Sequence, residues 1–235
     1  MRRFIDFNRA RFRSDDYAAL YDWSVASPAE FWEAVWQFCE IKAAAPHDTV
    51  LRDASRMPGA KWFEGAKLNF AANLLDHDAR GTAVVFANER NERSQLTWPE
   101  LRAQVASVAA RLRALGVRRG DRVAAFIANR PEAVVAMLAT ASIGAVWSSC
   151  SPDFGVDAVL DRFGQIEPKV LFATDGYFYS GKSIDSLPTV RAVAARLTGL
   201  AAIVIVPYRS QDPDLSSLPN AHLFDELLEQ QAQPR

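Results

Sequence analysis

Apolar residues in the last two-thirds of the chain form short continuous runs, separated by stretches in which apolar residues recur at helical spacing. The runs predict strands at residues 82–88, 122–128, 145–150, 169–174 and 201–206. The stretches between them predict helices at residues 97–115, 129–143, 155–166 and 189–197. Strands that are nearly continuous apolar runs and alternate with helices indicate an α/β fold, with a mostly parallel sheet flanked by helices.

Local signals mark where the predicted helices begin and end. Thr97 and Glu100 have the spacing of a capping box, and Gly116 follows the last apolar position of the same helix. A Ser or Asn with Glu three residues later recurs at two other predicted helix starts, Ser27 with Glu30 and Asn129 with Glu132. We therefore expect a capped helix at each of the three positions.

Residues 1–80 follow a different pattern. Apolar residues recur at helical spacing behind Pro28 and predict a helix to about residue 44, and a short helix is predicted to end near Leu75. We predict that residues 1–80 are a helical extension packed on a larger domain, which occupies residues 81–235. The last predicted element is a short amphipathic helix at residues 222–229.

Composition and charge are those of an ordinary globular protein. The 235 residues are 49% hydrophobic and 23% charged, with a formal net charge of −1, so we expect neither nucleic acid nor a membrane as a partner. The longest apolar runs, residues 133–139 and 200–206, fall far below the roughly 20 residues that span a bilayer. The start of the chain has no signal-peptide pattern, and the two cysteines imply no disulfide framework. A cytoplasmic protein is expected.

Residues 176–183 match the nucleotide-binding pattern G-x-x-x-x-G-K-[ST] and follow a predicted strand. Three consecutive aromatic residues fill the part of the motif that would have to curl around a phosphate. Pro188 would interrupt the helix expected after Lys182, and the next predicted strand lacks the terminal Asp that binds magnesium. A P-loop nucleotide hydrolase is therefore an alternative that the sequence does not favour.

Other candidate groups form weaker patterns. The histidines have no metal-ligand spacing, so no metal site is predicted: His47, His77 and His222. Cys150 ends a predicted strand without a recognisable partner base, which favours packing over nucleophilic catalysis. Carboxylates also recur every fourth residue, as on a solvated helix face: Asp153, Asp157 and Asp161. No catalytic residue is predicted in this chain.

Four segments occur in an order that indicates a family. They are residues 96–101 (LTWPEL), 115–124 (LGVRRGDRVA), 129–132 (NRPE) and 138–152 (LATASIGAVWSSCSP). Together they resemble the succession of core motifs in the adenylate-forming superfamily, which contains acyl-CoA synthetases, luciferases and the adenylation domains of peptide synthetases. The resemblance implies the N-terminal subdomain of the adenylate-forming fold.

Two further segments resemble one branch of that superfamily. Residues 62–69 (WFEGAKLN) with 73–75 (NLL) are similar to the N-terminal extension of acetyl-CoA and acetoacetyl-CoA synthetases. Acetyl-CoA synthetases usually carry Gly-Gly-Phe where this chain has Pro152-Asp153-Phe154, and residues 147–156 look instead like the acetoacetate–CoA ligase family. The resemblance favours acetoacetate as the acid, with a synthetase of the acetyl or propionyl type as the alternative.

The resemblance also implies a binding role for the motif at residues 176–183. In related synthetases the loop at this position contacts the phosphorylated nucleotide end of CoA, which implies that CoA is bound by Tyr179, Ser180, Gly181 and Lys182. Lys182 takes the place of an arginine and keeps a cation, whereas Tyr179 takes the place of another and loses one.

The family reaction implies cofactors that this chain is not expected to hold alone. A carboxylate is joined to the α-phosphate of ATP with Mg²⁺, and the CoA thiol then displaces AMP. The family's phosphate-binding loop is rich in Ser, Thr and Gly, but the adjacent serines at 148–149 and 216–217 do not lead into Gly-Thr. We expect this chain to be the N-terminal portion of an acid–thiol ligase and to be inactive alone. We expect it to lack the family's C-terminal domain and, of the substrates and cofactors, to contact only CoA. A non-catalytic CoA-binding module is a further alternative.

Overall fold

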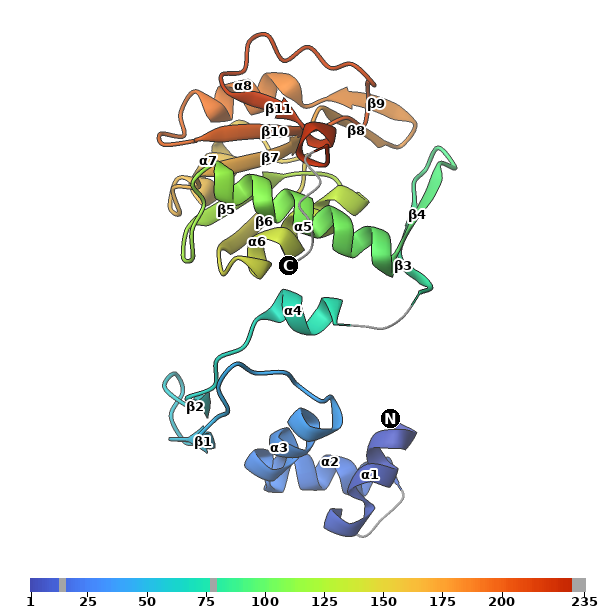
Figure 1. The fold of residues 1–235 in the computed structure, drawn as a ribbon, viewed down its shortest axis with the longest axis vertical. Helices are drawn as coiled ribbons and strands as arrows, with labels where there is room; N and C mark the ends of the chain where they lie inside the picture. Colours follow the sequence, from blue (N-terminus) through green and yellow to red (C-terminus); the bar gives the residue numbers. More distant parts are fainter. Residues whose placement is uncertain (13–15, 77–79, 230–235) are drawn as a thin grey trace. The chain divides into compact units, whose positions relative to one another are not determined.

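The computed structural model describes residues 1–12, 16–76 and 80–229 (Figure 1). They belong to two compact units, Met1–Asn73 and Leu74–Arg235. Each unit has its own strands and its own buried core.

The second unit is built on a five-stranded sheet in which all neighbouring strands are parallel. Its strands, in the order in which they lie side by side, are β11 (Ala221–Leu223), β10 (Ala202–Val206), β7 (Val170–Thr174), β5 (Arg122–Phe126) and β6 (Val146–Cys150). The three central strands are almost entirely buried, as expected of a sheet covered on both faces. The predicted α/β fold is therefore confirmed.

Four helices connect and cover these strands (Figure 1). They are α5 (Trp98–Ala114), α6 (Pro131–Ser142), α7 (Val156–Phe163) and α8 (Leu187–Ala194). On one face of the sheet, alternate residues such as Phe126 and Leu171 pack against Val159 of α7 and Val190 of α8. Helices α5 and α6 pack against each other and cover the opposite face.

Helix α5 begins and ends where the sequence signals predict. The Glu100 N–H donates to Thr97 Oγ1 at 3.4 Å, and the Thr97 N–H donates to Glu100 Oε2 at 2.7 Å, which completes the capping box. These bonds to the backbone and hydroxyl of Thr97 hold the pKa of Glu100 below its ordinary value. At the other end Gly116 has a φ of 83°, and the Val117 N–H returns to the Leu112 carbonyl at 2.9 Å.

The other two predicted capping boxes do not form. Ser27 makes no capping bond with its side chain, and the Trp23 indole donates to Glu30 at 3.4 Å. Helix α6 has Arg130, not Asn129, as its N-cap residue, without a side-chain cap. Sequence spacing alone predicted these caps, but Glu30 accepts from the Trp23 indole and Glu132 accepts from the Arg130 guanidinium instead.

Two short hairpins complete the second unit. They are β3 (Thr82–Ala87) with β4 (Arg93–Thr97), and β8 (Gly176–Tyr179) with β9 (Lys182–Asp185).

The predicted helix at 222–229 is wrong: β11 joins the sheet there and a single 3₁₀ turn, Phe224–Leu227, follows. The buried rings of Phe224 and Phe172 pack together, so burial against the sheet outweighs the local amphipathic pattern.

The first unit is mainly helical around a small aromatic core. Its elements are α1 (Arg2–Phe12), α2 (Tyr17–Ala26), α3 (Pro28–Phe38), β1 (Thr49–Arg52), β2 (Lys61–Glu64) and the start of α4 (Phe70–Leu75). Helix α3 ends six residues before the predicted end, because Glu40 adopts a left-handed conformation with a φ of 51°. Strands β1 and β2 pair antiparallel.

Candidate functional site

The strand order produces a crevice at the carboxyl ends of β5 and β7. The chain leaves β5 to form β6 on one side, then crosses to form β7 on the other side. The connecting helices therefore diverge at this point, where open α/β sheets bind their ligands. A cavity of about 980 Å³ opens here.

Five separate segments of the second unit line this cavity. The first is the end of strand β3 and the turn after it, with Phe86 and Glu89. The next two are the β5–α6 connection with Asn129 and strand β6 with Trp147 and Cys150. The last two are hairpin β8–β9 with Phe178 and Tyr179, and the loop after β10 with Tyr208. Six of the residues that line the cavity are aromatic: Phe86, Trp147, Tyr177, Phe178, Tyr179 and Tyr208. Such walls offer flat apolar faces to a ligand with a planar ring.

One wall is an aromatic cluster around Arg130. The Tyr208 ring lies 5.2 Å from the Phe178 ring and 6.3 Å from the Phe86 ring, centroid to centroid. The Arg130 guanidinium lies 4.8 Å above Tyr208 and 5.2 Å above Phe86, and it donates two hydrogen bonds to Glu132 at 2.6 and 3.0 Å. The cation is thus already neutralised by a carboxylate, and it serves here to hold the rings together.

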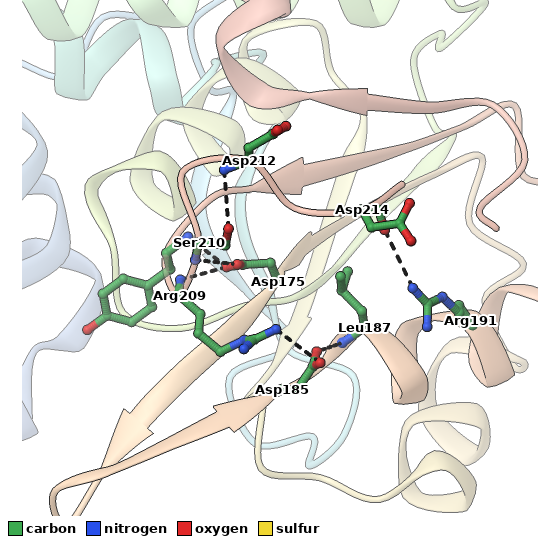
Figure 2. A network of polar contacts seen from close by, with 9 residues as sticks. Asp175, Asp185, Leu187, Arg191, Arg209, Ser210, Asp212 and Asp214 are labelled. Atoms are coloured by element: carbon green, nitrogen blue, oxygen red, sulfur yellow. Dashed lines mark hydrogen bonds and ion pairs between the residues drawn. The ribbon is translucent and has the colours of Figure 1, made fainter. Parts of the chain in front are cut away.

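A buried carboxylate fixes the loop that carries Tyr208. Asp175 follows β7 directly and is 0% exposed. It accepts hydrogen bonds from the backbone N–H groups of Tyr208 at 2.7 Å, Arg209 at 2.8 Å and Ser210 at 2.8 Å (Figure 2). The position of the Tyr208 wall therefore depends on a residue that does not line the cavity.

An ion pair ties the same loop to hairpin β8–β9. Arg209 contacts Asp185 at 3.0 Å, and Asp185 also accepts the Leu187 N–H at 3.0 Å at the start of α8 (Figure 2). The hairpin, the helix that follows it and the loop after β10 are in this way linked through one carboxylate.

The four residues predicted to contact CoA lie at the tip of hairpin β8–β9. Tyr179 pairs with Lys182 across the hairpin, and Ser180 and Gly181 form the two-residue turn with φ values of 52° and 75°. Positive φ at both central positions is the geometry of a tight hairpin turn. All four residues are exposed, and Tyr179, 69% exposed, lines the cavity.

The segment that matches the nucleotide-binding pattern, residues 176–183, is therefore part of hairpin β8–β9. A Cβ added to Gly176 would overlap the carbonyl oxygen of Ile184 on the paired strand, and Gly181 is needed for the left-handed turn. Lys182 begins strand β9, whereas a P-loop requires a helix at that position. The geometry thus differs from that of a P-loop.

Sequence reasoning missed a contact between the two hairpin turns. The backbone N–H groups of Ser180 and Gly181 donate to the two carboxylate oxygens of Glu89, at 2.9 and 3.0 Å. Arg90 lies 4.4 Å above the Phe178 ring. The contact joins residues 91 and 92 positions apart, so no local pattern could indicate it.

The remaining candidate groups do not form a catalytic constellation. Burial raises the pKa of the Cys150 thiol to about 11, so it is protonated and unreactive at neutral pH. His47 contacts Glu33 at 2.8 Å, His222 contacts Glu226 at 3.2 Å, and His77 lies outside the described residues. Within residues 1–12, 16–76 and 80–229, no three His, Cys, Asp or Glu side chains gather closely enough to hold a metal ion. No helix in that same part of the chain has the length and apolarity to cross a membrane.

Two protein families match successive parts of the chain. The AMP-binding enzyme family matches residues 74–233, which is more than half of the chain, and the chain belongs to that family. The family described as the acetyl-coenzyme A synthetase N-terminus matches residues 17–74.

The chain is also similar in sequence to individual acetoacetyl-CoA synthetases. The chain is 48% identical over 218 residues to the acetoacetyl-coenzyme A synthetase of Rhizobium meliloti, covering 92% of this chain and 33% of that protein. It is 42% identical to the acetoacetyl-CoA synthetase of Danio rerio, covering 91% and 32%. Among solved structures it resembles the acetoacetyl-CoA synthetase of Streptomyces lividans, with a TM-score of 0.90 and 42% identity, covering 99% of this chain and 36% of the other. The predicted resemblance is confirmed, and the chain spans about a third of the length of these relatives.

Proposed function

We propose that these residues form the N-terminal part of a cytoplasmic acid–thiol ligase that converts acetoacetate, ATP and CoA into acetoacetyl-CoA, AMP and pyrophosphate. The reaction passes through an acyl-adenylate, which the CoA thiol then attacks. The observation that carries the proposal is the match to an acetoacetyl-CoA synthetase structure over 99% of the chain at 42% identity.

The contribution of this chain to the reaction is the binding of CoA. The aromatic walls of the cavity suit the adenine ring of CoA, and Tyr179, which lines the cavity, belongs to the hairpin tip. That tip has a cation on Lys182 and two backbone N–H groups on Ser180 and Gly181, which bond the Glu89 carboxylate in this structure. Ring stacking and cationic contacts to phosphate are the interactions that such a nucleotide requires. The residues present therefore fit CoA.

Residues 1–12, 16–76 and 80–229 show no comparable site for ATP and Mg²⁺. The described part of the chain holds no cluster of three metal-ligating side chains. The adjacent serines at 148–149 and 216–217 are not followed by Gly-Thr. We assign no step through ATP or Mg²⁺ to these 235 residues and infer that they form no adenylate alone.

The experiment compares two ligands and two lysine variants. Calorimetric titration should show that Lys182→Ala weakens CoA binding about threefold to tenfold, because one cation facing a phosphate is removed. Binding of dephospho-CoA, which lacks the 3′-phosphate, should change less. Lys67→Ala, an exposed lysine of the first unit, is the matched control and should leave both affinities unchanged. Equal binding of CoA by all three proteins would contradict the assignment of the hairpin tip.

A further inference from the structure

The turn of hairpin β8–β9 has the features of a backbone anion site that is already filled by a carboxylate of the same chain. Consecutive N–H groups of Ser180 and Gly181 point to Glu89, each bonding a different carboxylate oxygen at 2.9 and 3.0 Å. Consecutive N–H groups that converge on one anion form a concave site suited to phosphate and carboxylate groups. The left-handed conformation of both turn residues aims the two N–H groups in the same direction.

The location of this turn places it within reach of a ligand in the cavity. Glu89 and Tyr179 both line the cavity, from opposite hairpins, and Lys182 pairs with Tyr179 across β8–β9. A phosphate group at the cavity mouth would therefore meet the Glu89 carboxylate first. Two anions cannot share the same pair of donors without repulsion.

Glu89 can be displaced because it is held only from one side. Its side chain is exposed, and its carboxylate accepts hydrogen bonds from the two turn amides. The described part of the chain places no cationic side chain in an ion pair with it. A phosphate monoester carries close to two negative charges at neutral pH and offers three acceptor oxygens, so it makes stronger hydrogen bonds than a carboxylate. The advantage of Glu89 is that it is tethered near the site and needs no binding from solution.

We propose that Glu89 is an internal competitor at the Ser180–Gly181 turn, which leaves the two amides when a phosphate group of the ligand in the cavity binds there. The exchange makes ligand binding weaker than the turn alone would allow, and it keeps the amides satisfied when no ligand is present. The identity of the ligand as CoA rests on the proposed function, but the anion site does not.

The test uses the whole chain and inorganic phosphate as the probe, followed by the amide resonances of Ser180 and Gly181 in NMR spectra. Both resonances should shift on titration, and Glu89→Gln should reach half-saturation at a phosphate concentration about threefold to tenfold lower than the unaltered chain. Glu89→Ala should show at least the same gain, because no side-chain oxygen remains to compete. Ionic strength is held constant throughout.

Glu92→Gln is the matched control. Glu92 lies in the same turn and carries the same charge, but its carboxylate contacts Arg90 and Asn88 instead of the turn amides. A gain in Glu89→Gln that exceeds the gain in Glu92→Gln supports displacement at the amides. Equal gains, weaker binding in both Glu89 variants, or amide resonances that do not respond to phosphate would overturn the proposal.

A parallel titration with CoA and dephospho-CoA separates the two proposals. If inorganic phosphate behaves as expected and neither CoA compound binds, the CoA function fails and the anion site stands. If CoA binds equally well to the unaltered chain and to both Glu89 variants, the competitor role fails and CoA binding stands.

Discussion

At the scale of single residues, the most consequential side chain lies behind the cavity and not in it. Asp175 is fully buried and its carboxylate is satisfied by three backbone N–H groups. Buried donors that lose their acceptor are costly, because neither water nor another group replaces it.

Replacing Asp175 by Ala should lower the free energy of unfolding by roughly 3 kcal/mol, since three backbone N–H groups lose a buried carboxylate as their acceptor. The free energy of unfolding of Asp175→Asn should lie between those of the unaltered chain and Asp175→Ala, because the amide oxygen of Asn can still accept some of these hydrogen bonds. Urea unfolding followed by circular dichroism measures both. Asp212→Ala, an exposed residue of the same loop, should change the value by no more than about 0.5 kcal/mol. A similar effect of Asp175→Ala and Asp212→Ala would contradict the role given to Asp175.

Sequence reasoning could not have identified Asp175 or Glu89. Asp175 binds donors 33 to 35 positions away, and Glu89 binds donors 91 and 92 positions away. A polar residue directly after an apolar strand carries no sign of its partners. A local pattern marked the segment from Tyr179 to Lys182, but its assignment to CoA came only from a family resemblance.

At the scale of elements, one ion pair joins the starts of two strands to the end of a helix. Lys169, directly before β7, donates to Asp121 at 2.7 Å and to the Gly116 carbonyl behind α5 at 3.1 Å. Asp121, directly before β5, also accepts the Arg118 N–H at 2.7 Å. The hydrogen bond from Lys169, followed by that from Arg118, lowers the pKa of the Asp121 carboxyl.

A carboxyl whose pKa is lower in the folded than in the unfolded chain stabilises the fold above the unfolded pKa. That contribution is lost as the pH falls through the folded pKa. Asp121→Asn should therefore lower stability by about 1 kcal/mol or less at pH 7, and the difference from the unaltered chain should shrink below about pH 4. Melting temperatures of both proteins between pH 7 and pH 3 measure this. In a Lys169→Met background the effect of Asp121→Asn should be smaller, and a difference that does not vary with pH would contradict the assignment.

The sequence predicted regular elements better than irregular ones, for a physical reason. Strands β5, β7 and β10 are almost entirely apolar because both of their faces are buried, so composition alone indicates them. Hairpin β8–β9 is marked by glycines whose pattern also occurs in phosphate-binding loops. Strand β11 is three residues long and is held by pairing with β10, which an amphipathic pattern does not register.

At the scale of the whole molecule, the chain has the cavity in which we propose that CoA binds, and its described residues hold no cluster of metal-ligating side chains. It spans about a third of the length of acetoacetyl-CoA synthetases to which it is similar. The complete reaction therefore remains a property proposed for the longer enzyme.

The isolated 235 residues should release no pyrophosphate from ATP in the presence of acetoacetate and Mg²⁺, because no residue here is assigned to the ATP phosphates. A coupled pyrophosphate assay measures this, with the full-length synthetase of Rhizobium meliloti as the positive control. Acetoacetate-dependent release above the buffer blank would show that the inference about adenylate formation is wrong.

The strand order of the sheet also determines how it grows on the ribosome. Strand β5 is synthesised before the four strands that follow it, and β6 pairs with one of its edges. Strand β7 then pairs with the other edge of β5, β10 pairs with β7, and β11 pairs with β10. Besides the outer edge of β6, the nascent sheet thus presents one growing parallel edge at a time, and each pause in translation between these strands leaves that edge available to a chaperone or to a neighbouring nascent chain.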